Sequence, residues 1–326
     1  MRKKWFVIFG VALLAAWVVI GYVATNPVVG DHAHVRRFIA QPQDYGLAAE
    51  VVRFPSTDGI PLVAWWLPAP GEARGTVILV HGRDGNRSHM LSRAGFLVRN
   101  GYNALAVDLR AHGESGGNYM TPGYLEARDI LGALGYLRQR DVHGPIAVLG
   151  HSFGAVATLH AAAESPEVAA AVADCAFISP SDMMARAGDV VAKDKNASPW
   201  MKFGVRLASS RWSELAVLPV YYLRTGVKLD SRKAAALSAI ARLGQRPVLF
   251  IAGERDALAP PENALRMYEA AQSPQKALLV VPGAGHNTTY RTSPQQYETA
   301  VLDFLQKVFS EKETQGRQLT ESLGPA

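Results

Sequence analysis

The sequence predicts an α/β fold with a mostly parallel central sheet, helices on both faces of that sheet and a helical cap insertion. Three observations support this prediction. Short apolar runs alternate with helix-like segments along most of the chain, several runs end in glycine-rich turns, and one connection is far longer than an ordinary loop. With 326 residues and 48% hydrophobic content, the chain can bury a large core, so we expect one domain with an insertion.

The expected elements begin with a hairpin and continue as alternating strands and helices. The hairpin joins Val51–Phe54 to Leu62–Leu67 and is expected at the antiparallel edge of the sheet. Buried strands are expected at Thr76–Val80, Ala104–Val107, Ile146–Leu149, Pro247–Gly253 and Ala277–Val281. Helices are expected at Arg87–Asn100, Pro122–Arg140, Ser152–Glu164, Pro261–Gln272 and Pro294–Phe309.

The N-terminal segment is apolar enough to cross a membrane. Trp5–Val23 is a run of 19 residues without a charge, and it follows Arg2-Lys3-Lys4. We therefore expect a single-pass membrane protein whose N-terminus is cytoplasmic and whose folded domain is extracytoplasmic, although Arg36 and Arg37 weaken this charge bias. A cleaved signal peptide is the alternative, but the run exceeds the usual length of about 7–15 residues and no A-x-A site follows it.

Composition divides the chain into three parts. Residues 1–30 form the membrane anchor and a linker, residues 31–310 form the folded domain, and residues 311–326 form a polar tail that we expect to be flexible. Within the domain, the long connection at about residues 175–245 is the cap insertion.

The cap insertion has two features that bear on its partners. Trp200, Phe203 and Leu207 fall on one helix face, which can line an acyl-chain pocket, touch a membrane or pack on the main domain. Between Asp182 and Lys233 the chain holds ten Lys or Arg against five Asp or Glu. This excess suits an anionic lipid surface or an acidic substrate, and a solvated helical surface explains it equally well.

The most informative motif is the pentapeptide Gly150-His151-Ser152-Phe153-Gly154, which joins an apolar run to a helix-like run. A G-x-S-x-G turn between a strand and a helix holds its serine in a strained backbone conformation with Oγ exposed. The glycines remove Cβ atoms that would clash. A serine in this position becomes a nucleophile when a neighbouring base takes its proton, so Ser152 is the candidate catalytic nucleophile.

The candidate partners of Ser152 follow two later strands. Asp256 lies three residues past the closing glycine of its strand, and His286 ends the glycine-rich loop after the next strand. The order serine, acid, histidine, with each on a loop at the carboxyl end of a strand, predicts that His286 is the base. Asp256 would then fix the tautomer of the imidazole. The adjacent Glu254 is the competing acid.

Two backbone N–H groups are expected to stabilise the oxyanion that forms during attack. One belongs to Phe153, the residue after the serine, and the other belongs to Arg83 in the turn that follows the first buried strand. His81 is expected to support this turn through the hydrogen bonds of its ring. Asp108 is expected to structure the neighbouring loop.

No cofactor, metal or nucleic-acid partner is expected. No P-loop or G-x-G-x-x-G follows a strand, and His32 and His34 form a pair where a zinc site needs three or four ligands. Cys175 is the single cysteine, so no intramolecular disulfide can form, and we expect it to pack as a small buried hydrophobe. Although the net charge is +6, the basic residues are dispersed and no nucleic-acid motif is present.

On these motifs, the chain resembles the α/β-hydrolase superfamily. The resemblance rests on GHSFG, HGRDGN, GERD, GAGH and the DLRAHGES segment at Asp108–Ser115, and it covers roughly Glu50–Phe309. Within the superfamily, the chain is similar to N-terminally anchored serine hydrolases whose relatives include protein depalmitoylases and lipid esterases. The resemblance implies the α/β-hydrolase fold. One departure is Ala111, where many relatives have a glycine, and we expect only a slight change in that loop.

These observations lead to one functional hypothesis and two alternatives. The hypothesis is a membrane-anchored serine hydrolase that cleaves a carboxylic ester or thioester through an acyl-enzyme on Ser152. The anchor and the cap favour a small acyl or lipid-like substrate. The alternatives are a serine peptidase that uses the same residues and a non-catalytic scaffold that retains the fold. The acyl-chain length, the leaving group and the oligomeric state are not predicted.

Overall fold

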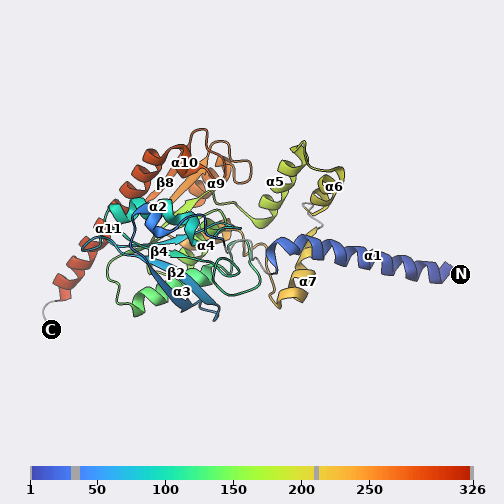
Figure 1. Ribbon diagram of the computed structural model, residues 1–326, viewed down its shortest axis with the longest axis horizontal. Helices are drawn as coiled ribbons and strands as arrows, with labels where there is room; N and C mark the ends of the chain where they lie inside the picture. The colour runs from blue at the N-terminus through green and yellow to red at the C-terminus, as the bar shows by residue number, and fades with distance from the viewer. Residues whose placement is uncertain (1, 31–36, 209–212, 324–326) are drawn as a thin grey trace.

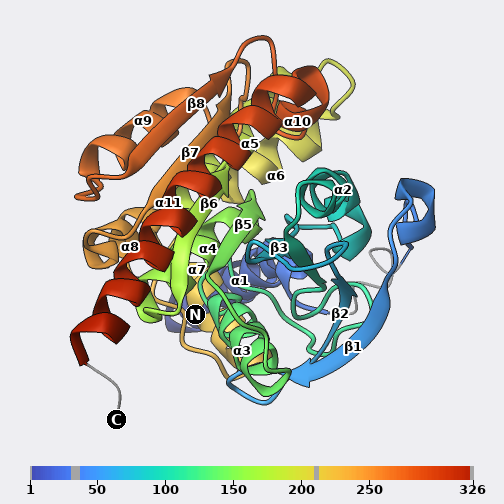
Figure 2. The same cartoon turned by 90° about the vertical axis from the view of Figure 1, so that its left-hand side faces the viewer.

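An eight-stranded sheet organises the chain in the computed structural model, which describes residues 2–30, 37–208 and 213–323. The strand order is β1-β2-β4-β3-β5-β6-β7-β8. The pairs β1–β2 and β2–β4 are antiparallel, and all other neighbouring strands are parallel. The predicted mostly parallel sheet with an antiparallel edge is confirmed (Figures 1 and 2).

All of the expected strands are present, and there is one more. The strands are β1 (Glu50–Pro55), β2 (Pro61–Leu67), β3 (Thr76–Val80), β4 (Asn103–Val107), β5 (Ile146–His151), β6 (Val168–Asp174), β7 (Val248–Gly253) and β8 (Lys276–Val281). The additional strand is β6, whose alanine-rich run has a low strand propensity. It forms because β5 and β7 pair with it on either side and every one of its residues is buried.

Helices cover both faces of the sheet. The helices are α1 (Arg2–Thr25), α2 (Leu91–Arg99), α3 (Ala127–Gln139), α4 (Phe153–Glu164), α5 (Pro180–Lys193), α6 (Pro199–Ala208), α7 (Ser213–Thr225), α8 (Ala236–Leu243), α9 (Pro261–Ala270), α10 (Thr289–Thr292) and α11 (Pro294–Leu323), and a short 3-10 helix, η4 (Arg87–Met90), precedes α2. Buried side chains of α3, α4, α8 and α9 pack on one face, and those of α2 and α11 pack on the other (Figure 2).

The helix predicted at Arg87–Asn100 begins with η4 and becomes α-helical only at Leu91, and two other helices differ more from their predicted bounds. Helix α3 begins at Ala127 rather than Pro122, because the Glu126 carboxylate accepts hydrogen bonds from the N–H and the Oγ1 of Thr121 and so holds this segment in a turn. Helix α11 continues to Leu323, whereas residues 311–326 are expected to form a flexible tail. The sequence after Glu311 contains Lys, Glu, Gln and Arg, which are good helix formers without an apolar face.

The long connection between β6 and β7 forms helices α5 to α8. Of these, α8 packs on α4 and joins the main core through Ala236, Ala239 and Ile240. Helices α5 and α6 pack on each other, and α7 packs along α1. Figure 1 shows α5, α6 and α7 on the same side of the molecule as the projecting α1, opposite the end of α11.

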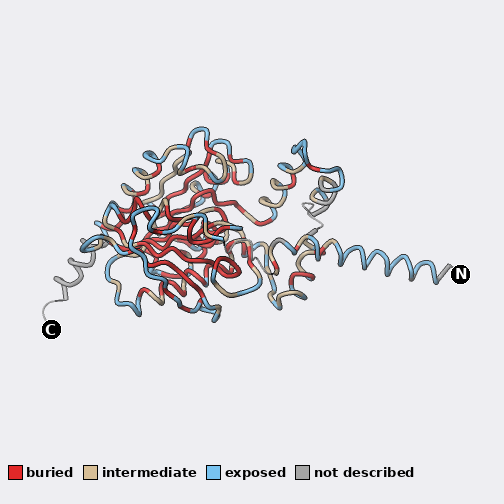
Figure 3. The backbone as a smooth tube through the Cα atoms, viewed as in Figure 1, coloured by how far each residue is buried: buried red, intermediate tan, exposed pale blue. Residues whose placement is uncertain are grey.

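Helix α1 is the one described helix that is long and apolar enough to cross a membrane, with a mean hydropathy of 2.5 over Lys4–Thr25. A signal sequence near an N-terminus passes the same test. The described side chains from Trp5 to Val19 are exposed, as the pale tube in Figure 3 shows. Gly21 and Thr25 are buried, so α1 meets the rest of the protein only through its last turns.

Candidate active site

Ser152 lies in the sharp turn between β5 and α4. Its φ of 54° is in the left-handed region, which confirms the strained backbone conformation expected from the motif. A Cβ at Gly150 would lie 2.1 Å from the carbonyl oxygen of Gly154, and a Cβ at Gly154 would lie 2.5 Å from the carbonyl oxygen of Val80. Only glycines therefore allow this turn to pack against β3.

The three side chains expected to act together are in contact. The Oγ of Ser152 lies 2.9 Å from the Nε2 of His286, and the Nδ1 of His286 lies 2.7 Å from an Oδ2 of Asp256. The Asp256 carboxylate needs a proton on Nδ1 in this contact, which leaves Nε2 free to accept the proton of the serine hydroxyl. The geometry is that of an activated hydroxyl with an oriented base.

Asp256, rather than Glu254, faces the histidine. The Oδ1 of Asp256 accepts hydrogen bonds from the N–H groups of Leu258 and Ala259, each at 2.8 Å, and its side chain is fully buried. Glu254 instead accepts a hydrogen bond from the N–H of Gly283 at 2.7 Å, where it supports the loop that leads to His286. The two carboxylates thus have different positions and different partners.

The turn after β3 passes next to Ser152. A Cβ at Gly82 would lie 3.2 Å from the Cβ of Ser152, so the backbone of this turn is close to the serine. Within the described residues, neither the N–H of Arg83 nor that of Phe153 donates a hydrogen bond. Both amides are therefore available to an oxygen atom bound beside Ser152.

His81 supports this turn as predicted. Its Nε2 accepts a hydrogen bond from the N–H of Leu109 at 3.1 Å, so Nδ1 carries the proton and donates to the carbonyl oxygen of Gly82 at 2.7 Å. Burial lowers the pKa of His81 well below its ordinary value, which keeps the ring neutral. Its neighbour His112 is buried against the His81 ring and does not line the cavity beside Ser152.

Asp108 organises the adjacent loops. It is fully buried, forms an ion pair with the guanidinium of Arg87, and accepts hydrogen bonds from the N–H groups of Arg87 and Glu114 at 2.7 and 2.9 Å. This is the structural role expected from the sequence. Nearby, Ala111 adopts a φ of 57° without the conformational freedom of glycine.

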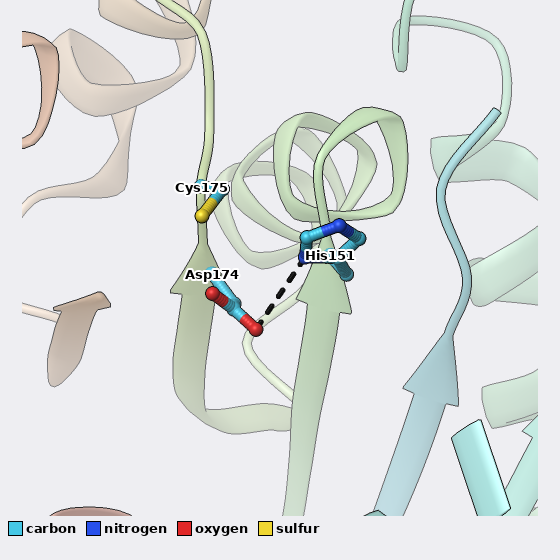
Figure 4. Close-up of side chains that lie close together, drawn as sticks. All are labelled: His151, Asp174 and Cys175. Carbon is cyan, nitrogen blue, oxygen red and sulfur yellow. Dashed lines mark ion pairs between the residues drawn. The ribbon is translucent and has the colours of Figure 1, made fainter. Parts of the chain in front are cut away.

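A buried network around Asp174 is not predicted from the sequence. Asp174 accepts hydrogen bonds from the Oγ1 of Thr289 at 2.9 Å, the OH of Tyr297 at 3.1 Å and the guanidinium of Arg93 at 3.2 Å. His151, the neighbour of Ser152, completes the set, with its Nδ1 3.4 Å from the Asp174 carboxylate (Figure 4). The network fixes the end of β6 beside the end of β5.

The electrostatics of this network keep Asp174 ionised. Burial alone raises the pKa of Asp174, but the close contact with His151 and the positive charge of Arg93 outweigh burial, so the pKa lies below its ordinary value. The Nε2 of His151 lies 3.0 Å from the side-chain oxygen of Asn287. Since Asn287 follows His286, the network extends to the loop that carries His286.

Cys175 lies between the two histidine–aspartate pairs. Potential ligand atoms of His151, Asp174 and Cys175, the side chains drawn in Figure 4, lie within 4.8 Å of one another. The same holds for those of Cys175, Asp256 and His286. A thiol ligates a metal as the thiolate. Burial, together with the two neighbouring carboxylates, raises the pKa of Cys175 well above its ordinary value, so a metal bound here would have to displace the thiol proton. The other candidate pair, His32 and His34, lies outside the described residues.

A cavity of about 820 Å³ opens above Ser152 and His286. Its lining combines apolar with basic or imidazole side chains, and Asp84 adds one carboxylate. Apolar side chains come mainly from α5 and the loops near it: Met183, Met184, Ala187, Phe153, Phe177 and Leu258. Basic or imidazole side chains come from the turn after β3, from η4 and α2, from the end of β5 and from α10: Arg83, His89, Arg93, His151 and Arg291. The cavity can therefore hold a molecule with an apolar part and an anionic or polar part.

A model of the alpha/beta hydrolase family matches residues 77–300 of this chain. The chain belongs to the alpha/beta hydrolase family. This alpha/beta hydrolase is 30% identical to YqkD of Bacillus subtilis over 241 residues, which is 73% of each protein. It is 28% identical to the alpha/beta hydrolase domain-containing protein WAV2 of Arabidopsis thaliana over 94% of this chain and 93% of WAV2.

Solved structures of esterases are similar to this alpha/beta hydrolase. The esterase Pf2001 of Pyrococcus furiosus superposes with a TM-score of 0.69 at 27% identity, over 84% of this chain and 96% of the esterase. The family and the esterase neighbours support an enzyme with hydrolase activity.

Proposed function

We propose that this alpha/beta hydrolase is a serine hydrolase that cleaves a carboxylic ester or thioester through an acyl-enzyme on Ser152. The observation that carries the proposal is the pair of contacts at the wall of the cavity, 2.9 Å from Ser152 to His286 and 2.7 Å from His286 to Asp256. These contacts supply a nucleophile, a base and a group that orients the base.

In the first half of the reaction, the Oγ of Ser152 attacks the carbonyl carbon of the substrate while its proton moves to the Nε2 of His286. Asp256 remains ionised and stabilises the imidazolium. The carbonyl oxygen becomes an oxyanion, which accepts hydrogen bonds from the N–H groups of Arg83 and Phe153. In other enzymes the loss of one such donor raises the barrier by about 2.7–4 kcal/mol.

In the second half, His286 returns the proton. The bond to the leaving group breaks, and the alcohol or thiol departs with the proton from Nε2, which leaves the acyl group on Ser152. Water then gives a proton to Nε2 and attacks the acyl carbon, and the same amides bind the second oxyanion. Collapse of this intermediate releases the carboxylic acid and restores the proton on Ser152.

The two-part lining of the cavity supports an acyl or lipid-like substrate. The thioether and aliphatic groups of Met183, Met184 and Ala187 offer apolar contacts to an acyl chain. The exposed Arg291 offers positive charge to a polar or anionic leaving group. A small amphiphilic ester or thioester satisfies both parts.

Contacts of α1 support its retention as a membrane anchor rather than its removal as a signal peptide. The guanidinium of Arg224 donates hydrogen bonds to the Oγ1 of Thr25 at 2.8 Å and to the carbonyl oxygen of Tyr22 at 3.2 Å, and it lies over the Tyr22 ring. Removal of α1 would leave this face of α7 without its partner. The basic residues before Trp5 favour a cytoplasmic N-terminus and an extracytoplasmic catalytic domain.

Hydrolysis of p-nitrophenyl esters of increasing acyl-chain length by the detergent-solubilised full-length protein tests the proposal. We expect turnover that depends on chain length and that falls by about 10⁴-fold or more in Ser152→Ala. Turnover that persists in Ser152→Ala would contradict the assignment of the nucleophile.

The same assay separates the two alternatives. Cleavage of peptides, but not of esters or thioesters, would favour a peptidase. Absence of all hydrolysis, in a protein that also fails to react with a serine-directed phosphonate, would favour a non-catalytic scaffold.

A further inference from the structure

Apolar side chains on α6 and α7 project into solvent beside α1. Trp200 on α6 is 83% exposed, and Leu215, Tyr222 and Leu223 on α7 are 59%, 53% and 78% exposed. We call these four side chains the cap surface. Of the apolar helix face expected from the sequence, Trp200 is exposed, whereas the side chains of Phe203 and Leu207 lie outside the described part of the structure.

The length of α1 determines how far the cap surface lies from a membrane that α1 crosses. From Trp5 to Val19, where the described side chains are exposed, α1 has 15 residues and extends about 22 Å at 1.5 Å per residue. The hydrocarbon core of a bilayer is about 30 Å thick, so roughly five further residues of α1 must lie within it. Those residues are Ile20–Ala24, the turns of α1 that contact α7.

Helix α7 is fixed to these turns of α1. A Cβ at Gly21 would lie 2.6 Å from both the carbonyl oxygen of Ala216 and a methyl group of Val220, so the two helices approach as closely as glycine permits. On its other side, α7 is held to the main domain by Tyr221, whose OH donates to the carbonyl oxygen of Met120 at 3.1 Å. When α1 spans a bilayer, the first half of α7 is therefore at the boundary of the hydrocarbon core.

The charge around the cap surface is complementary to anionic lipid. Partly or fully exposed basic side chains lie on α5 and α6, between them and just after α7: Lys193, Lys195, Lys202, Arg206 and Lys228. They outnumber the exposed or half-buried acidic residues of α5–α7 and their connections, Asp182, Asp189, Asp194 and Glu214. A tryptophan and leucines flanked by lysines and arginines are the composition of segments that bind the membrane interface. Soluble proteins rarely expose such side chains together without a partner.

We propose that the cap surface inserts into the interface of an anionic lipid bilayer and that the cavity takes its acyl substrate from that bilayer. The second part rests on the hydrolase function proposed above, whereas the first part does not. Helix α5 connects the two parts, because it packs on α6 and also presents Met183, Met184 and Ala187 to the cavity. An acyl chain leaving the bilayer thus meets apolar side chains on its way to Ser152.

Depth-dependent quenching tests the insertion. The full-length chain, with Trp200→Cys or Leu215→Cys, is labelled with the fluorophore NBD and reconstituted into vesicles of phosphatidylcholine and phosphatidylglycerol with brominated acyl chains. The native Cys175 is 1% exposed and stays unlabelled under native conditions. The matched control is Leu265→Cys on α9, which is also an exposed leucine.

We expect brominated lipid to quench the fluorophore at positions 200 and 215 by about twofold or more, and to leave the fluorophore at position 265 unchanged. Equal quenching at all three positions, or none at 200 and 215, would overturn the insertion. The two labelled positions lie on different helices, α6 and α7. A local folding defect caused by one substitution therefore leaves the other position as an independent measurement.

Activity measurements test the source of the substrate. We expect Trp200→Glu combined with Leu215→Glu to reduce hydrolysis of a long-chain ester in vesicles by about tenfold, with hydrolysis of soluble p-nitrophenyl butyrate unchanged and Leu265→Glu as the control. Equal losses on both substrates would contradict delivery from the bilayer. Quenching at 200 and 215 without hydrolysis of either ester by the parent protein would refute the hydrolase function and leave the insertion standing.

Discussion

At the scale of single residues, the packing and hydrogen bonding of the surrounding backbone hold Ser152 in its strained conformation. An L-residue in the left-handed region costs about 1–2 kcal/mol, and here the cost is offset by packing of the turn against β3 and by the hydrogen bond from the N–H of Ser152 to the carbonyl oxygen of Asp174 at 2.8 Å. The strain directs Oγ toward His286. The turn therefore requires Gly150 and Gly154 as well as the serine, because a side chain at either glycine would clash with the neighbouring backbone.

The buried carboxyl group of Glu126 should make the free energy of unfolding depend on pH. Burial raises its pKa from 4.5 to about 7, against the lowering effects of Arg110 and Thr121. The folded protein thus favours the protonated form. The stabilising contribution of this group is complete below pH 4.5, the unfolded value, and is lost as the pH rises through 7.

Glu126→Gln stays neutral at every pH and should not lose this contribution. We expect the free energy of unfolding of Glu126→Gln, relative to the parent protein, to increase by about 3 kcal/mol between pH 4.5 and pH 8. Thermal unfolding of both proteins at several pH values measures the change, with the exposed Glu269→Gln as the control. A constant difference across this range would contradict the raised pKa.

The residues of the candidate site divide by how they can be found. Ser152, Asp256 and His286 each follow a strand with a strong apolar signal, so their meeting at one edge of the sheet follows from the spacing. The three side chains that donate hydrogen bonds to Asp174, those of Arg93, Thr289 and Tyr297, are 81, 115 and 123 residues away from it in sequence, and no local pattern links them to it. The available signal is the position of Asp174 at the end of a buried strand next to β5.

At the scale of elements, α1 and α7 approach each other closely at a single glycine. Gly21 permits the close approach to Ala216 and Val220, whereas no atom lies within 4 Å of a Cβ built at Gly10 in the same helix. The two glycines have the same intrinsic helix propensity, so substitutions at them differ only through the atoms that surround each one.

Gly21→Leu should therefore destabilise the protein, and Gly10→Leu should not. We expect a loss of about 1–3 kcal/mol for Gly21→Leu, because a larger side chain forces the helices apart. Thermal unfolding of the detergent-solubilised full-length protein measures it. Identical melting temperatures for the two variants would contradict the packing of α1 on α7.

Elements with a strong pattern are predictable, and elements held by context are not. Thr76–Val80 and Val248–Gly253 contain β-branched and aromatic residues flanked by turn residues, so their strands are evident. The alanines of β6 carry no such signal and form a strand because two neighbours pair with them. The start of α3 depends on the hydrogen bonds between Glu126 and Thr121, which no periodicity reveals.

At the scale of the whole molecule, the parallel sheet collects the chemistry at one edge. The alternation of strands and helices predicts the two covered faces, but it does not predict the side on which α1 and α5–α7 lie. That side depends on contacts between segments about 200 residues apart, such as Arg224 with Thr25. As a result, α5, α6 and α7 lie on the same side of the molecule as α1 (Figure 1).

The most direct test of the central claim is the site of covalent labelling by a fluorophosphonate. Attack of the Oγ of Ser152 on phosphorus displaces fluoride, so we expect mass spectrometry to find the adduct on the peptide that contains Ser152. The adduct should be absent in Ser152→Ala, and its formation should be about 10³-fold slower or worse in His286→Ala. An adduct on another serine, or equal labelling of Ser152→Ala, would contradict the account.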